Sequence, residues 1–150
     1  MTPYDHTQRA PLGLLMGTAS LCTLVLGLGQ DDETARVLLL ALAIVFAAIV
    51  AMFSQLSVRE EPDRLRVRFG PLPWCGTDVR YEGVRALRRA RSRLIDGWGI
   101  HWLPGRGWTY NLWGFDCVEL QTPRGIVRIG TDDPDGLVQH LSQRTGLPAG

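Results

Sequence analysis

The sequence VLLLALAIVFAAIVAMFSQL, Val37 to Leu56, determines how the rest of this chain can be arranged. No charged residue lies between Arg36 and Arg59. A helix needs about 20 apolar residues to cross the roughly 30 Å hydrocarbon core of a bilayer. A helix at the surface of a soluble protein would carry a polar stripe, and none is present from Val37 to Phe53. The stretch therefore predicts a transmembrane helix.

A second uncharged stretch precedes it, at Leu12–Gly29, and is also long enough to span a bilayer. A signal peptide is the rival interpretation. Against it, the head of the chain has only one basic residue, Arg9, and no small-x-small cleavage site precedes Asp31. We therefore expect residues 1–56 to form a short head and a hairpin of two transmembrane helices, at about 12–29 and 37–56.

Arginine residues near the helix ends predict the orientation of this hairpin, because positively charged loops remain in the cytoplasm. The tip between the helices has Arg36 alone, and the amino-terminal side has Arg9. Four arginines follow the second helix closely: Arg59, Arg64, Arg66 and Arg68. We therefore expect both termini to lie in the cytoplasm, with the acidic tip on the opposite side of the membrane.

Small residues recur at four-residue spacing in both predicted helices. Gly13 and Gly17 form a G-x-x-x-G pair, and the second helix carries Ala43, Ala47 and Ala51. Small residues at this spacing allow helix backbones to approach closely in lipid. They predict packing within the hairpin or homo-oligomerisation between copies. The alternative is that glycine and alanine are simply common in membrane helices.

Beyond Leu56 the apolar residues alternate with polar ones, which is typical of strands. Glycine, proline and aspartate pairs separate the segments and predict turns. Residues 84–92 fit either a strand or a basic amphipathic helix. Counting that segment, residues 57–150 contain about seven short strands: LSVREE, RLRVRF, VRALRRARS, WGIHWL, WTYNL, FDCVELQ and IVRIGT.

The last part of the chain predicts a helix. Asp133 is a favourable N-cap, and Pro134 suits the first helical position. Leu137 and Leu141 supply an apolar stripe, and Gly146 ends the helix. Seven short strands followed by one helix indicate a small mainly-β barrel or sandwich with a carboxyl-terminal helix.

The run GWGIHWLPGRGWTYNLWGFDCVELQTPRGIVRIGTDDPDGL, Gly97 to Leu137, resembles the second half of a bacterial pleckstrin-homology-like (PH-like) domain. The resemblance rests on the G-W-G-I strand, the Y-N turn, the V-E-L strand and the I-G-T-D-x-P sequence before the helix. It covers about residues 56–145, and many small members of this family carry two membrane helices ahead of the domain. It implies a PH-like barrel over 57–150 in which residues 84–92 form a strand, in a protein of the bacterial inner membrane. Its motifs are structural and imply no particular ligand.

Five arginines lie between Gly83 and Ile95 with no acidic residue among them: Arg85, Arg88, Arg89, Arg91 and Arg93. Next to a cytoplasmic leaflet, each such charge contributes about 1 kcal/mol of attraction to anionic lipid. The alternative is a sheet edge protected by charge. Nucleic acid is not an expected partner, because residues 57–150 carry fourteen arginines against eleven acids and are tethered to a membrane.

No residue pattern predicts catalysis. His101, Asp116 and Cys117 most resemble a nucleophile set, but neighbouring residues of a strand point to opposite faces. The three histidines are widely spaced, so no metal site, cofactor or small-molecule substrate is predicted. Most of the five tryptophans are expected in the core, with one or two at a partner site or in the headgroup layer.

Taken together, these patterns predict a membrane-anchored PH-like binding or scaffolding module. Its expected partners are membrane lipids, a protein, or further copies of the chain. The first hypothesis is protein interaction or homo-oligomerisation at the membrane. The alternative hypothesis is recognition of anionic lipid headgroups by the five arginines.

Overall fold

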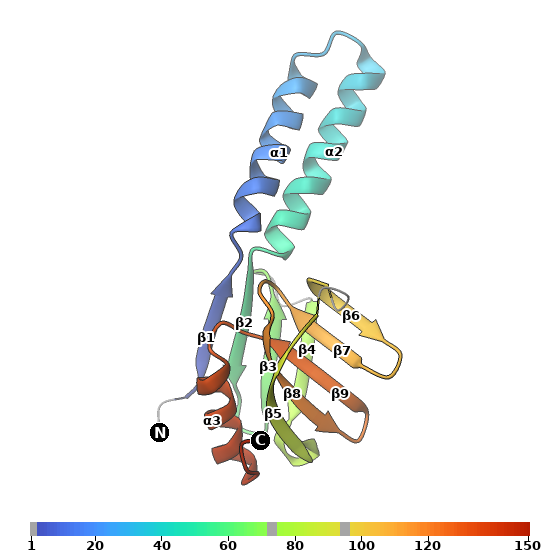
Figure 1. The fold of residues 1–150 in the computed structure, drawn as a ribbon. Coiled ribbons are helices and arrows are strands. Elements are labelled where there is room, and N and C mark those ends of the chain that lie inside the picture. Colours follow the sequence, from blue (N-terminus) through green and yellow to red (C-terminus); the bar gives the residue numbers. More distant parts are fainter. Residues whose placement is uncertain (1–2, 72–74, 94–96) are drawn as a thin grey trace.

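A computed structural model of the chain describes residues 3–71, 75–93 and 97–150. In it, a hairpin of two helices stands on one end of a β-rich region that carries a third helix (Figure 1). The hairpin helices are α1 (Leu12–Leu28) and α2 (Glu33–Met52). Of the described helices, α2 is the one that is long and apolar enough to cross a membrane, and only Ala43 of its residues is buried. A core helix of a soluble protein would instead be buried.

The second helix is displaced relative to the predicted range, beginning at Glu33 and ending at Met52 instead of Leu56. It begins early because the Asp32 carboxylate caps it, accepting a 2.7 Å hydrogen bond from the backbone N–H of Ala35. It ends early because the last residues of the apolar run belong to the β-rich region and not to the helix. Leu56 belongs to the core of the β-rich region, where its side chain is 1% exposed.

The first sheet contains a strand, β1, that the sequence did not indicate. The sheet is antiparallel, and its strands lie in the order β1 (Asp5–Arg9), β2 (Gln55–Glu60), β3 (Arg64–Phe69) and β4 (Cys75–Arg80). The sequence of β1, DHTQR, has no apolar residue to mark it as a strand. It pairs with β2 from Arg9 opposite Gln55 to Asp5 opposite Arg59. Both helices therefore continue into paired strands, and no flexible tether separates them from the sheet (Figure 1).

The second sheet has the order β5-β8-β9-β7-β6. Its strands are β5 (Ala86–Arg91), β6 (Gly99–Leu103), β7 (Gly107–Asn111), β8 (Asp116–Thr122) and β9 (Gly125–Gly130). The pair β7–β9 is parallel, and the other neighbours are antiparallel. A short 3-10 helix, η1 (Tyr81–Gly83), precedes β5, and α3 (Pro134–Thr145) follows β9.

The predicted closed barrel of about seven strands is wrong. The described residues form nine strands in two sheets, and each sheet keeps two edges. Besides β1, the additional strand is β4, whose sequence CGTDVR lacks the apolar alternation of a strand. Pairing with β3 determines this strand, because strand propensity is weaker than its tertiary context. The expected strand at 84–92 is confirmed for Ala86–Arg91.

The core lies between the two sheets and beneath α3. Leu56, Leu65 and Val67 from the first sheet meet Leu120 and Ile129 from the second. Leu137 and Leu141 of α3 are also fully buried. This helix covers one of the two boundaries between the sheets, where β1 and β2 lie beside β5 and β8. We call each boundary a seam, and the second seam lies between β4 and the β7–β9 pair. No described element fills it.

The end of α2 is seated directly on the β-rich region. The ring of Phe53, the residue after α2, packs edge-on against Phe69 with ring centroids 5.6 Å apart. Gly70 has a φ of 68°, and a Cβ atom there would lie 2.8 Å from the carbonyl oxygen of Ala51. On the second sheet, a Cβ atom at Gly99 would lie 3.4 Å from the Phe53 ring. The end of each sheet that contains these residues is therefore the end nearest the helices.

Candidate functional site

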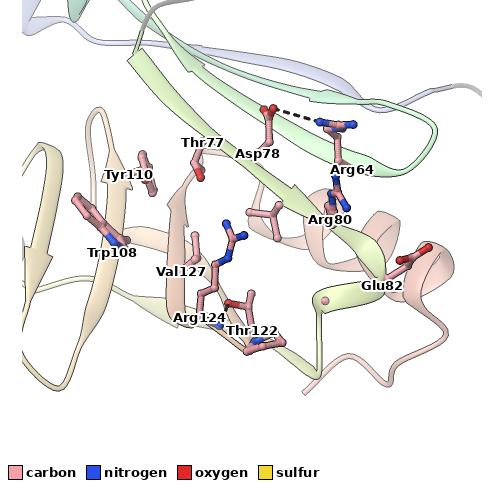
Figure 2. A pocket seen from close by; sticks show the side chains of 13 residues that line it. Arg64, Thr77, Asp78, Arg80, Glu82, Trp108, Tyr110, Thr122, Arg124 and Val127 are labelled. Atoms are coloured by element: carbon pink, nitrogen blue, oxygen red, sulfur yellow. Dashed lines mark hydrogen bonds and ion pairs between the residues drawn. The ribbon is translucent and has the colours of Figure 1, made fainter.

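The open seam between the sheets contains a groove of about 710 Å³ (Figure 2). Its apolar floor consists of Trp108 and Tyr110 on β7 and Val127 on β9. The rings of Trp108 and Tyr110 lie nearly parallel, with centroids 6.1 Å apart. The remaining walls come from the start of β3, from β4 and η1, and from the β8–β9 hairpin: Arg64, Thr77, Asp78, Val79, Arg80, Glu82, Gly83, Thr122, Pro123 and Arg124.

The tryptophans are more exposed than the sequence suggested. Trp98, Trp102 and Trp108 are 42%, 56% and 45% exposed, whereas Trp113 packs against the core. Trp74 lies outside the described residues. The reason is the position of β6 at the edge of its sheet, where Trp102 stands opposite Trp108 without a further strand to cover them. The expectation that most tryptophans are buried is therefore wrong for the described part of the chain.

The charges around the groove are only partly neutralised. Asp78 accepts a 2.7 Å ion pair from Arg68, and Arg64 pairs with Asp63 at 2.9 Å. The hydrogen bond from the Arg64 guanidinium lowers the pKa of the Asp63 carboxyl group. Arg124 extends from the β8–β9 turn into the middle of the groove (Figure 2). Among the described residues it has no carboxylate within ion-pair distance, so its charge is available to a ligand.

A second hollow, of about 290 Å³, is almost entirely lined by charged side chains. It lies on the face of the second sheet that points away from the core, because Arg88, Glu119 and Arg128 alternate with the buried Leu87, Leu120 and Ile129. We call it the arginine hollow. Its lining residues are Arg88, Arg89, Ala90, Arg91, Arg93, Arg106, Glu119 and Arg128.

The centre of the arginine hollow is an ion triad with two buried members. Strand register places Glu119 opposite both Arg88 and Arg128. One carboxylate oxygen of Glu119 accepts hydrogen bonds from Arg88 at 2.7 and 3.0 Å, and the other pairs with Arg128 at 2.6 Å. Glu119 and Arg128 are only 2% and 7% exposed. Arg128 also donates a 2.6 Å hydrogen bond to the carbonyl oxygen of Arg106.

The structure separates the five arginines of the predicted cluster. Arg88, Arg89, Arg91 and Arg93 line the hollow, whereas Arg85 lies outside it, where its backbone N–H bonds Gln121. Besides Glu119, which binds Arg88, acidic residues distant in sequence approach two more of them. Arg89 pairs with Asp135 at 2.9 Å, and both Arg89 and Arg91 lie 3.9 Å from Asp116. Because β5 has one neighbour, β8, this segment is also an edge strand.

Sequence reasoning missed Arg106, Glu119 and Arg128 as members of this hollow. The available signal was a charged residue at the centre of two otherwise apolar strands, V-E-L and V-R-I. A charge in the middle of a buried strand needs a partner of opposite sign on the neighbouring strand. Recognising the pair required knowledge of which strands are neighbours.

Of the small residues predicted to pack, the hairpin of a single copy buries Ala43, and Gly27 makes a further close approach that was not predicted. A Cβ atom at Gly13 or Gly17 would have no neighbour within 4 Å, whereas one at Gly27 would lie 3.1 Å from Leu39 Cβ. Ser20 donates a 3.0 Å hydrogen bond to the carbonyl oxygen of Ala43, which is buried against α1. Ala47 and Ala51 are exposed in a single copy. Packing through the Gly13–Gly17 pair therefore remains a prediction for contacts between copies.

The residues that most resemble a nucleophile set do not converge. His101 lies on β6, and β7 and β9 separate that strand from Asp116 and Cys117 on β8. Cys117 is fully buried, and Asp116 faces Arg89 and Arg91. Within residues 3–71, 75–93 and 97–150, no group of three histidine, cysteine or acidic residues is arranged to hold a metal ion.

Comparison with protein-family models, curated proteins and solved structures finds no match for this chain. Its function must therefore be inferred from its own geometry.

Proposed function

We propose that this chain is a membrane-anchored binding module of the PH-like family, which engages a protein partner at the inner membrane of a bacterium. The family assignment rests on the motifs of Gly97–Leu137 and on the order of strands followed by α3. The barrel of such a domain is replaced here by two sheets with one filled and one open seam.

Exposed apolar side chains on both hairpin helices support the membrane anchor. They include Leu14, Leu21 and Leu26 on α1 and Leu38, Leu42 and Ile44 on α2. Contiguous apolar surface of this extent is costly in water, and a bilayer would cover it. We propose that both helices span the membrane and that the β-rich region lies in the cytoplasm. The pairing of β1 with β2 supports placing both ends of the hairpin on the same side.

The observation that carries the proposed interaction is the open seam. An extended protein segment can add to the free edge of β4, which has β3 as its neighbour, and pair with its backbone groups. An apolar side chain of that segment would cover Trp108 and Tyr110, and an acidic one would meet Arg124. We therefore propose an extended partner segment that carries both kinds of side chain.

The test is photo-crosslinking from Thr77, inside the groove, in membranes of the native host. We expect one discrete adduct whose crosslinked peptide contains an acidic residue. Arg124→Glu should abolish the adduct, and Arg59→Glu, on the far side of the first sheet, should leave it intact. Changing the acidic residue of the partner peptide to arginine should restore the adduct with Arg124→Glu. An adduct that Arg124→Glu does not weaken would refute the proposal. An adduct between two copies would assign the seam to homo-oligomerisation.

A second candidate function is recognition of anionic lipid headgroups, and the arginine hollow favours it. Arg91 and Arg93 flank Ser92, whose side chain lies 3.4 Å from the amide of Asn111. Asn111 stands opposite Gly99, the residue next to Phe53 at the end of α2. These contacts support a position for one end of the hollow close to the membrane surface. We propose no catalytic role, because the described nucleophile candidates lie apart.

A further inference from the structure

We propose that the arginine hollow is a binding site for a phosphate group, either free or as part of a lipid headgroup. This site is distinct from the open seam, and its existence does not depend on the proposed protein partner. The proposed membrane anchor matters only for the choice between the two sources of phosphate.

The first argument is the charge balance of the ion triad. Glu119 carries one negative charge and binds two guanidiniums, so the triad of Arg88, Glu119 and Arg128 has one positive charge in excess. The two buried members, Glu119 and Arg128, neutralise each other at 2.6 Å. The excess charge therefore lies on Arg88, whose side chain is 60% exposed and can meet an anion that enters the hollow from solvent.

The surrounding arginines leave this excess at one positive charge, because two acidic residues lie beside two of them. Arg89 and Arg91 share Asp116 at 3.9 Å, a distance longer than a direct hydrogen bond, and Arg89 also reaches Asp135. Leaving aside Arg93 and Arg106, which have other contacts, four arginines meet three carboxylates. Guanidinium groups present several N–H donors in a planar fork that matches the oxygens of phosphate.

The second argument is that the site is already organised. Glu119 fixes Arg88 and Arg128 from opposite sides through strand register, and the carbonyl oxygen of Arg106 holds the second terminal nitrogen of Arg128. Guanidiniums that are held before the ligand arrives lose little conformational entropy on binding. The volume of about 290 Å³ suits a small anionic group and not a large apolar ligand.

The experiment measures binding of inorganic phosphate to the purified full chain in a neutral detergent, by isothermal titration calorimetry at low ionic strength. We expect saturable binding that sulfate displaces and chloride at equal ionic strength does not. Arg88→Gln should weaken binding about tenfold or more, because it removes charge-assisted hydrogen bonds. The matched control is Arg59→Gln, since Arg59 is also a strand arginine with one carboxylate partner. The side chains of Arg88 and Arg59 are 60% and 61% exposed.

The source of the phosphate is tested in nanodiscs of phosphatidylcholine with or without phosphatidic acid. If phosphatidic acid stabilises the folded parent chain against unfolding, and Arg88→Gln removes this stabilisation, the site binds a lipid headgroup. Binding of free phosphate without that stabilisation would assign it to a soluble ligand, and either result supports the site. Arg91→Gln, at a side chain 74% exposed, is the second variant if Arg88→Gln unfolds. No phosphate binding by the parent in either arm, or equal binding by the variants and Arg59→Gln, would overturn the proposal.

Discussion

The imidazole of His140 stacks on the ring of Tyr4, with centroids 5.2 Å apart and planes inclined by 25°. His140 belongs to α3 and Tyr4 precedes β1, so this contact joins the last helix to the first strand of the chain. The carboxylate of Glu60 lies 3.6 Å from His140 Nε2 but already pairs with Arg144. Burial lowers the pKa of His140, so its ring favours the neutral form in the folded chain.

This burial predicts a loss of stability in acid. The pKa of His140 is lower in the folded chain than in the unfolded chain, so the unfolded chain binds the additional proton below about pH 6.5. The free energy of unfolding should therefore fall as the pH falls through and below that value. His140→Gln should reduce this fall, and His101→Gln should not. Thermal unfolding of the full chain in detergent across this pH range measures the effect. Equal pH dependence in the parent and His140→Gln would contradict it.

Gly70 should be intolerant of any side chain, because it forms the joint between α2 and the first sheet. Its φ is 68°, and a Cβ atom would lie 2.8 and 2.9 Å from the carbonyl oxygens of Ala51 and Met52. Gly70→Ala should lower the free energy of unfolding by about 1–3 kcal/mol. The control is Gly114→Ala, where φ is 78° and no atom lies within 4 Å of the new methyl group. Equal effects in chemical denaturation would mean that backbone strain alone, and not the joint, sets the cost.

The glycines of α1 should divide into two functional groups. Gly27→Ile should disturb the hairpin itself, because a Cβ atom there already meets Leu39 and Leu40 at 3.1–3.2 Å. Replacing Gly13 and Gly17 together by isoleucine should leave the hairpin intact and weaken self-association of the chain in lipid. Chemical crosslinking in membranes measures self-association, and thermal unfolding reports on the hairpin. Unchanged crosslinking in the double variant would show that the pair is ordinary membrane composition.

The orientation of the hairpin predicts where a reporter is active. The arginines of β2 and β3 follow α2, so a reporter fused after Gly150 should behave as cytoplasmic. A fusion in the tip, between Asp31 and Asp32, should report from the opposite side. Activity of the Gly150 fusion outside the cytoplasm would overturn the proposed topology.

The sequence predicted those elements whose pattern is local. The uncharged run after Arg36 indicated α2, and Asp133 with Pro134 indicated the start of α3. It did not indicate β1 or β4, because their polar and glycine-containing sequences become strands only through pairing with β2 and β3. Barrel closure is equally non-local, since it depends on how two sheet edges meet.

The candidate sites follow the same division. The clustered arginines around Arg88 were visible in the sequence as a charge pattern. The ion pairs that Glu119 forms with Arg88 and Arg128 depend on the strand order β5-β8-β9. The groove was not predictable, because it depends on the parallel pairing of β7 with β9, which brings Arg124 near Trp108, and on the position of β4 opposite them. A sequence pattern gives the chemistry of a segment, and the sheet order determines which segments share a site.

The pairing of β1 with β2 also constrains the order of biosynthesis. Thr7 and Ser57, whose hydroxyl oxygens are 3.1 Å apart, are separated by 50 residues that include both helices. The first strand therefore emerges from the ribosome long before its partner and must remain unpaired while both hairpin helices are synthesised. An apolar strand in that position would associate with other chains. The polar sequence DHTQR does not indicate a strand, but it suits a segment that must remain soluble and unpaired until β2 has been synthesised.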